Sequence, residues 1–210
     1  MIDAPYIYRL LALAAFVCLA LLYDRRNARE KRYRKREYSF LLAVGAFGAV
    51  FGVLIDTVTS SISPVYFVAW KGLSDGPGFR AAVTTLGAQA GFSAGLLGAG
   101  ILLVVNSRRR DLALLLQYVA LSFACSALTA ATLGLLQHHF QLFELTDWAS
   151  LFDPSERQSF KTVWCVHLGV YVGGLIGLLF SCIRIRSERR SACPADGAGA
   201  DRGARGRGRP

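Results

Sequence analysis

Residues 24–59 read DRRNAREKRYRKREYSFLLAVGAFGAVFGVLIDTVT, and this stretch decides the fold class. Residues 24–37 carry eight Lys and Arg, and the apolar run that follows holds no charged residue before Asp56. An uncharged run of about 20 residues can cross a bilayer as a helix, and a basic block marks its cytoplasmic end. The stretch therefore predicts a transmembrane helix over residues 39–59 that runs from the cytoplasm outward.

The rest of the chain repeats this pattern of apolar runs between short polar segments. Similar runs occupy residues 4–23, 86–105, 112–136 and 163–183. Only 18% of the 210 residues are charged, whereas soluble domains carry about 25%. The first run has no basic block before it and no clear cleavage site, so an uncleaved helix is expected. The sequence predicts an all-α, polytopic membrane bundle of five transmembrane helices in one domain, residues 1–192.

The loops alternate between strongly and weakly basic. Residues 24–37, the loop 106–111 and the tail after residue 183 carry eight, three and eight Lys and Arg, and the other two loops carry two each. The basic side is cytoplasmic, which predicts an N-out/C-in protein of the bacterial cytoplasmic (inner) membrane. The net charge of +10 then suits anionic lipid head groups, not nucleic acid. The Arg/Gly-rich tail, 193–210, is predicted to be disordered and cytoplasmic.

Small residues recur at every fourth position in several runs, which places them on one helix face. These rows are Gly48-xxx-Gly52, Gly87-xxx-Gly91-xxx-Gly95 and Gly169-xxx-Gly173-xxx-Gly177. Close backbone contact drives helix association in lipid, so the second, third and fifth runs are expected to form a central cluster. The fourth run is expected to use Ala120, Ala124, Ala127 and Ala131 with Ser122, Ser126 and Thr129. The pattern leaves two alternatives open, homo-oligomerisation through the glycine faces and glycine flexibility for a transport motion.

Ionisable and polar residues within the runs mark a candidate site. Arg9, Asp56, Gln89 and His167 lie inside apolar runs, and Arg80 lies just before the third. A charge within a span costs roughly 2.5–3.5 kcal/mol on insertion scales and usually faces a partner or a cavity. In an N-out chain all five lie in the outer half of the membrane, which predicts a polar cluster around Asp56. Arg80 or Arg9 is the expected ion-pair partner, and a contact with His167 would form a protonatable pair.

The structural interpretation of these residues is that each side chain reaches the nearby membrane interface alone, or that an ion pair only holds two helices together. Aromatic residues gather in the outer loops 62–70 (ISPVYFVAW) and 140–152 (FQLFELTDWASLF). Such segments suit the membrane interface, and the alternative function is a lid over an outward-facing site. The five cysteines form no paired motif, and adjacent His138 and His139 form no metal motif. The sequence therefore predicts no metal and no cofactor.

Several segments also resemble a family of uncharacterised bacterial multi-pass membrane proteins. The run from Asp56 to Phe67, DTVTSSISPVYF, resembles the family's D-x-[IV]-[ST]-x-x-[IV]-[SC]-P-E-Y-F motif. Residues 78–83 (GFRAAV) and 163–168 (VWCVHL) are similar to its later segments, and the resemblance covers about 40–105 and 160–185. It implies membrane location and the motif positions Asp56, Ser63, Pro64, Tyr66, Phe67, Arg80 and His167. The chain departs from the pattern at Ile55, where the family has His, and at Val65, where it has Glu.

These observations leave three functions open. The first is a structural or accessory membrane protein that binds a partner or lipid. The second is a small transporter or channel component that uses Asp56 and Arg80, and the third is an intramembrane enzyme that uses Asp56 and His167. The departures at Ile55 and Val65 argue against an enzyme, so no catalytic residue is assigned. The candidate binding residues are Asp56, Arg80, His167, Tyr66, Arg9 and Gln89.

Structure can separate these functions. A water-filled cavity that reaches Asp56 favours transport, and a tightly filled interior favours a structural role. An acid and a histidine within about 4 Å of each other that face a pocket favour an enzyme, because proton transfer needs hydrogen-bond contact. The sequence does not identify a substrate, a partner protein or an oligomeric state.

Overall fold

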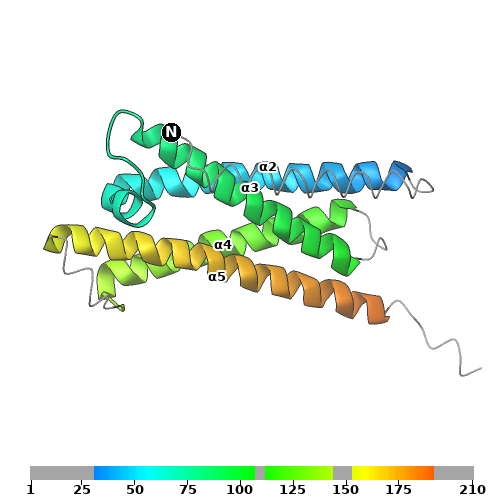
Figure 1. The fold of residues 1–210 in the computed structure, drawn as a ribbon. Helices are drawn as coiled ribbons and strands as arrows, with labels where there is room; N and C mark the ends of the chain where they lie inside the picture. The colour runs from blue at the N-terminus through cyan, green and yellow to red at the C-terminus, as the bar shows by residue number, and fades with distance from the viewer. Residues whose placement is uncertain (1–30, 107–111, 144–152, 192–210) are drawn as a thin grey trace, which may run out of the picture. The chain divides into compact units, whose positions relative to one another are not determined.

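A computed structural model describes residues 31–106, 112–143 and 153–191 of the chain, and all regular structure in them is helical (Figure 1). The elements are α2 (Lys31–Ile62), the π-helical turn η2 (Tyr66–Trp70), α3 (Phe79–Asn106), α4 (Leu112–Phe140) and α5 (Pro154–Ser191). The predicted all-helical fold is confirmed for this part of the chain. The expected first span, 4–23, and the tail, 193–210, lie outside the described residues.

Four of the described helices are long and apolar enough to cross a membrane. The candidate spans are Lys35–Ile62, Phe79–Asn106, Leu112–Phe140 and Glu156–Ser187. They match four of the predicted runs and extend beyond them, because helical hydrogen bonding continues through polar residues at the ends of an apolar run. Large apolar side chains such as Leu54, Leu128 and Leu179 are exposed along these helices. Such surfaces are compatible with contact to lipid.

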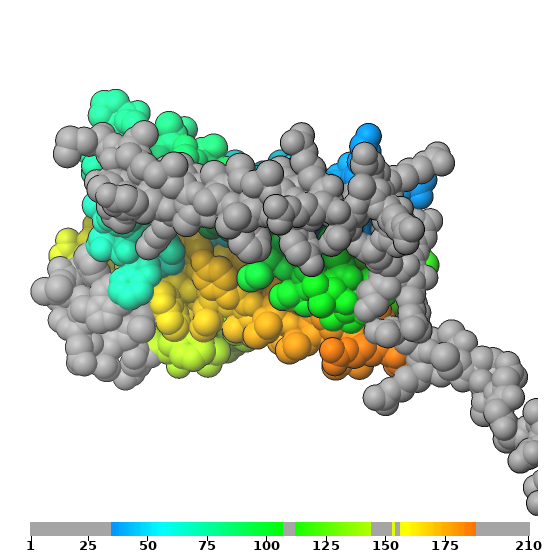
Figure 2. Space-filling view, turned by 45° about the vertical axis from the view of Figure 1, so that its right-hand side comes forward, coloured from blue at the N-terminus to red at the C-terminus, as the bar shows by residue number. Residues whose placement is uncertain are grey.

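The chain divides into two compact units, residues 1–39 and 40–210. Helix α2 begins in the first unit, and most of it belongs to the second. The second unit holds α3, α4, α5 and η2 together with the candidate site. Within it α3 packs against α5, and their side chains meet on the face drawn in green and orange in Figure 2.

Helices α2 and α3 touch through their backbones at two glycine pairs. A Cβ atom added to Gly87 would lie 2.6 Å from the carbonyl oxygen of Gly52, and one added to Gly91 would overlap the carbonyl oxygen of Gly48. No side chain fits in these gaps, so glycine is required at the crossing. The predicted glycine rows of α2 and α3 therefore do face each other.

The predicted partner of the α5 row was wrong. Gly169, Gly173 and Gly177 pack on α4 and not in a central cluster with α2 and α3. On α4 these glycines meet a stripe made of Ser122, Cys125, Thr129 and Ala130, and Gly174 meets Ser126 beside it. The face predicted for α4 is thus half right, because its Ser122, Ser126 and Thr129 pack on α5, whereas its alanine stripe, Ala120, Ala124, Ala127 and Ala131, is exposed. Both stripes are small enough to pack, and the observed choice keeps hydroxyl and thiol groups away from the outer surface.

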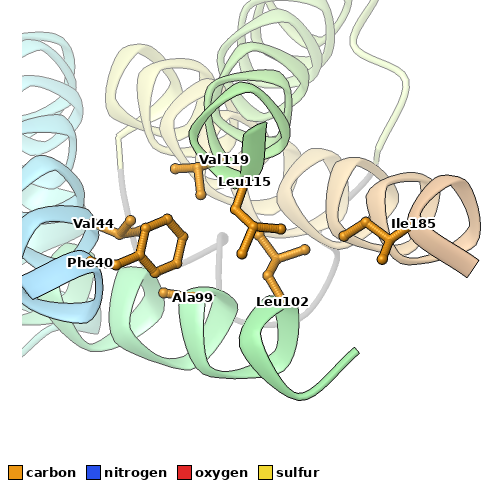
Figure 3. Packing of buried hydrophobic residues seen from close by; sticks show 7 residues of the cluster. All are labelled: Phe40, Val44, Ala99, Leu102, Leu115, Val119 and Ile185. Carbon is orange, nitrogen blue, oxygen red and sulfur yellow. The ribbon is translucent and has the colours of Figure 1, made fainter. Parts of the chain in front are cut away.

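Two apolar clusters close the ends of the second unit. One joins Phe40 and Val44 of α2, Ala99 and Leu102 of α3, Leu115 and Val119 of α4, and Ile185 of α5 (Figure 3). The other joins Tyr66 and Phe67 of η2 with Val83, Phe160 and Val163. The candidate site lies between them.

Candidate functional site

Two ionisable side chains from distant parts of the chain meet inside the second unit. Asp56 lies near the C-terminal end of α2, and His167 lies in the first half of α5. The distance between Asp56 Oδ1 and His167 Nε2 is 3.0 Å. Each residue exposes only 7% of its surface. A buried carboxyl group and a buried imidazole thus satisfy each other, as a low-dielectric interior requires.

The backbone of α5 fixes the protonation of the imidazole ring. His167 Nδ1 lies 2.9 Å from the carbonyl oxygen of Val163, one turn earlier. A carbonyl oxygen can only accept, so Nδ1 carries a hydrogen and donates it. Nε2 therefore shares one further proton with Asp56 Oδ1. The pair is neutral as a whole, whether this proton lies on the ring or on the carboxyl group.

The second carboxyl oxygen of Asp56 takes no part in this contact. Oδ2 lies beside α3, where a Cβ atom added to Gly87 would be 3.0 Å away from it. No described residue donates a hydrogen bond to Oδ2. Glycine at position 87 thus places no side chain against this oxygen, and Asp56 and Gly87 both line a cavity.

Aromatic rings enclose the histidine on the side of η2. The ring of Tyr66 stacks on that of His167, with centroids 4.8 Å apart and planes at 27°, and Phe67 meets His167 edge-on at 5.9 Å. Tyr66 and Phe67 are both buried. Burial raises the pKa of the Tyr66 hydroxyl above its ordinary value, so the phenol is protonated at neutral pH. Within the aromatic segment 62–70, Tyr66 and Phe67 therefore cover the ring of His167.

A cavity of about 310 Å³ extends from the pair between the four long helices. Its polar lining comes from Asp56, His167, Ser122, Ser126 and Tyr171. Apolar side chains and glycine backbone form the remaining walls, down to Val44 and Leu102 in the cluster of Figure 3. Val44 and Asp56 are twelve positions apart on α2, which is about 18 Å of helix at 1.5 Å per residue. The cavity is thus a mostly apolar slot with the Asp56–His167 pair at one end and two serines along its length.

The other predicted site residues lie elsewhere. Arg80 is exposed at the start of α3, about two turns before Gly87, which is the α3 residue level with Asp56. The expected ion pair of Arg80 with Asp56 is thus replaced by the contact with His167. Gln89 is exposed on α3 and does not line the cavity. Arg9 lies outside the described residues.

Sequence reasoning missed two residues that shape the site. Gly87 was assigned only to helix packing, although it also leaves room for Oδ2 of Asp56. Tyr171 lines the cavity and is 60% exposed. It follows His167 by four residues, a spacing that places both on one helix face, so this signal was available.

Among the described residues, no three His, Cys, Asp or Glu side chains gather closely enough to hold a metal ion. No protein-family model, no curated protein and no solved structure matches the chain. The resemblance to a bacterial membrane family therefore stays a prediction. The geometry of the cavity and its polar pair carries the functional argument.

Proposed function

We propose that this protein is an accessory protein of the bacterial inner membrane that binds a lipid-like molecule in its intramembrane cavity. The observation that carries the proposal is the slot of about 310 Å³ with apolar walls and the Asp56–His167 pair at one end. Binding pockets for small molecules are typically about 300–1,000 Å³ and mostly apolar, with a few convergent polar groups. A purely structural bundle would fill this space with side chains, because protein interiors are close-packed.

The rim of the cavity supports entry from the bilayer. Leu97 and Tyr171 both line the cavity, and they are 68% and 60% exposed. A ligand with a hydrocarbon chain could pass between these helices without crossing water. Its chain would contact the glycine and aliphatic walls, and its polar head would reach Asp56 and His167.

The membrane arrangement is part of the same proposal. Five spans with the N-terminus outside place the Asp56–His167 pair in the outer half of the bilayer. The alternation of strongly and weakly basic loops along the sequence supports this orientation. Basic segments at the other end of the helices would then face the anionic lipids of the cytoplasmic leaflet.

An intramembrane enzyme is the second candidate, and one observation favours it. The 3.0 Å contact of Asp56 with His167 borders the cavity, which is within reach for general acid–base chemistry. The transport alternative is supported by a cavity that reaches Asp56, but this cavity is mostly apolar and therefore unlike a water-filled path. That alternative also uses Arg80, and the exposed position of Arg80 at the start of α3 does not support it. Binding needs only the cavity and the polar pair at its end, so it is the function that the geometry supports best.

Blocking the cavity tests the proposal. Gly98 and Gly100 both lie in α3 with nothing within 4 Å of an added Cβ atom, but only Gly98 lines the cavity. In phosphatidylcholine nanodiscs, an alkyl probe with a photoreactive diazirine should label cavity-lining peptides of the wild type. Gly98→Phe should lose most of this labelling, and Gly100→Phe should keep it. Equal labelling of both variants would contradict ligand binding in the cavity.

A further inference from the structure

We propose that the ligand's head is a hydroxyl group, which donates its hydrogen bond to Asp56 Oδ2. This inference rests on the proposed function, because it names the chemistry recognised at the polar end of the same cavity. Oδ2 belongs to Asp56, which exposes 7% of its surface and borders the cavity, and this oxygen receives no hydrogen bond from the described residues. An acceptor that lies in mostly apolar surroundings without a donor is unfavourable, so a ligand that donates to it gains affinity.

Oδ2 is an acceptor wherever the shared proton lies. If the proton is on His167 Nε2, Asp56 is a carboxylate and Oδ2 is one of its two accepting oxygens. If the proton is on Oδ1, Oδ2 is the carbonyl oxygen of a neutral acid and still accepts. The remaining arrangement, with the proton on Oδ2, needs an imidazolium ring beside a neutral acid. That would leave a net positive charge inside apolar walls, which is unfavourable.

The neutrality of the pair restricts the charge of the ligand. An ammonium head could donate to Oδ2, but it would add an uncompensated charge to a mostly apolar cavity. A carboxylate or phosphate head would place its own acceptor oxygens against Oδ2, which is also an acceptor, so no hydrogen bond could form. A neutral hydroxyl group meets both conditions. The ligand class is therefore a long-chain or isoprenoid alcohol, or an acylglycerol with a free hydroxyl.

Glycine at position 87 is what allows a ligand to reach Oδ2 of Asp56. A side chain at this position would sit about 3.0 Å from Oδ2 and cover it. Gly87 therefore has two functions in one place, because its missing side chain lets α3 approach α2 and also keeps the acceptor open. The polar groups of Ser126 and Tyr171 border the same cavity.

A matched set of competitors tests the inference on the wild-type protein. In nanodiscs, three competitors of one chain length are compared for their ability to displace the diazirine alkyl probe. They are dodecanol, its methyl ether and dodecanoate. Dodecanol should displace the probe at about tenfold lower concentration than the ether, the effect expected of one hydrogen bond to a buried acceptor. Equal potency of alcohol and ether would overturn the hydroxyl assignment and leave cavity binding intact. Absence of cavity labelling would instead sink the proposed function itself.

Two substitutions at position 56 test whether residue 56 recognises the ligand by accepting a hydrogen bond from it or by exchanging a proton with it. In Asp56→Asn, the amide NH₂ can donate to Nε2 while the amide oxygen replaces Oδ2, so the preference for dodecanol should persist. In Asp56→Leu no acceptor remains, and alcohol and ether should become equally potent. Loss of the preference in Asp56→Asn would overturn the inference. If Asp56→Leu does not accumulate, the wild-type and Asp56→Asn comparisons decide the question.

Discussion

At the residue scale, Asp56 and His167 neutralise each other in a site that water does not reach freely. Each exposes 7% of its surface, and their 3.0 Å contact links α2 to α5. Removal of one partner leaves the other buried without a counterpart, which is strongly destabilising in protein interiors. The pair therefore holds the bundle together and also presents the polar end of the cavity.

This mutual dependence predicts non-additive substitutions. Asp56→Leu and His167→Leu should each lower thermal stability, and the double variant should be less damaged than the sum of the two. A coupling of about 1–3 kcal/mol is expected for buried residues in direct contact. Thermal unfolding of the four proteins in the same detergent measures it. Purely additive losses would mean that the two side chains do not depend on each other.

Tyr66 predicts a pH dependence with a defined sign. Burial raises the pKa of its hydroxyl above the ordinary value of about 10. The folded protein therefore keeps this proton after the unfolded chain has begun to release it. The contribution of Tyr66 to stability should be complete below about pH 10 and should fall as the pH rises further.

Tyr66→Phe keeps the ring that stacks on His167 but has no hydroxyl to titrate. Its melting temperature should be close to that of the wild type at pH 8 and should fall less between pH 8 and pH 11. Tyr66→Ala removes the ring and should cost about 3–5 kcal/mol through the cavity it leaves. Identical alkaline losses in wild type and Tyr66→Phe would contradict this account of Tyr66.

The sequence could predict that Asp56 and His167 share a level, because the up-and-down order of the runs places the end of the second run beside the start of the fifth. It could not choose between His167 and Arg80 as the partner of Asp56. That choice depends on helix rotation and on the backbone contact of Gly52 with Gly87, which spacing along one helix does not define. For the same reason the uncovered Oδ2 oxygen could not be foreseen.

At the element scale, the glycine rows predicted which faces of α2, α3 and α5 pack, but they did not predict that the α5 row packs on α4. The rows of α2 and α3 meet each other, and the α5 row meets the stripe of Ser122, Ser126 and Thr129 on α4. Small residues permit close approach to any other small face. The spacing of small residues therefore indicates which helix faces can pack closely. Which two faces meet depends on how all the helices are arranged in space.

The contact between α2 and α3 makes a direct prediction. Gly52→Leu would place a side chain against the backbone of Gly87 and should force the two helices apart, whereas Gly100→Leu on α3 has open space. Gly52→Leu should strongly reduce the thermal stability and the amount of monodisperse protein, and Gly100→Leu should change both little. Fluorescence-detected size-exclusion chromatography after heating compares them. Equal behaviour would show that this crossing does not depend on glycine.

At the scale of the whole molecule, the proposed orientation follows from charge and not from packing. Ser74, before α3, and Ser187, near the end of α5, are exposed positions at opposite ends of the bundle. Ser74→Cys and Ser187→Cys would each provide a single labelling site. In a variant without native cysteines, a membrane-impermeant maleimide should label position 74 from the periplasmic side of spheroplasts. Position 187 should react only after permeabilisation. The reverse result would place the Asp56–His167 pair in the inner half of the membrane.

The central claim is that the cavity holds a neutral, lipid-like molecule, and native mass spectrometry of the purified protein tests it most directly. The wild type and Gly100→Phe should release a bound species of constant mass that is a neutral alcohol or acylglycerol. Gly98→Phe, whose side chain enters the cavity lining, should carry none. Identical spectra for the three proteins, with or without an adduct, would contradict the claim.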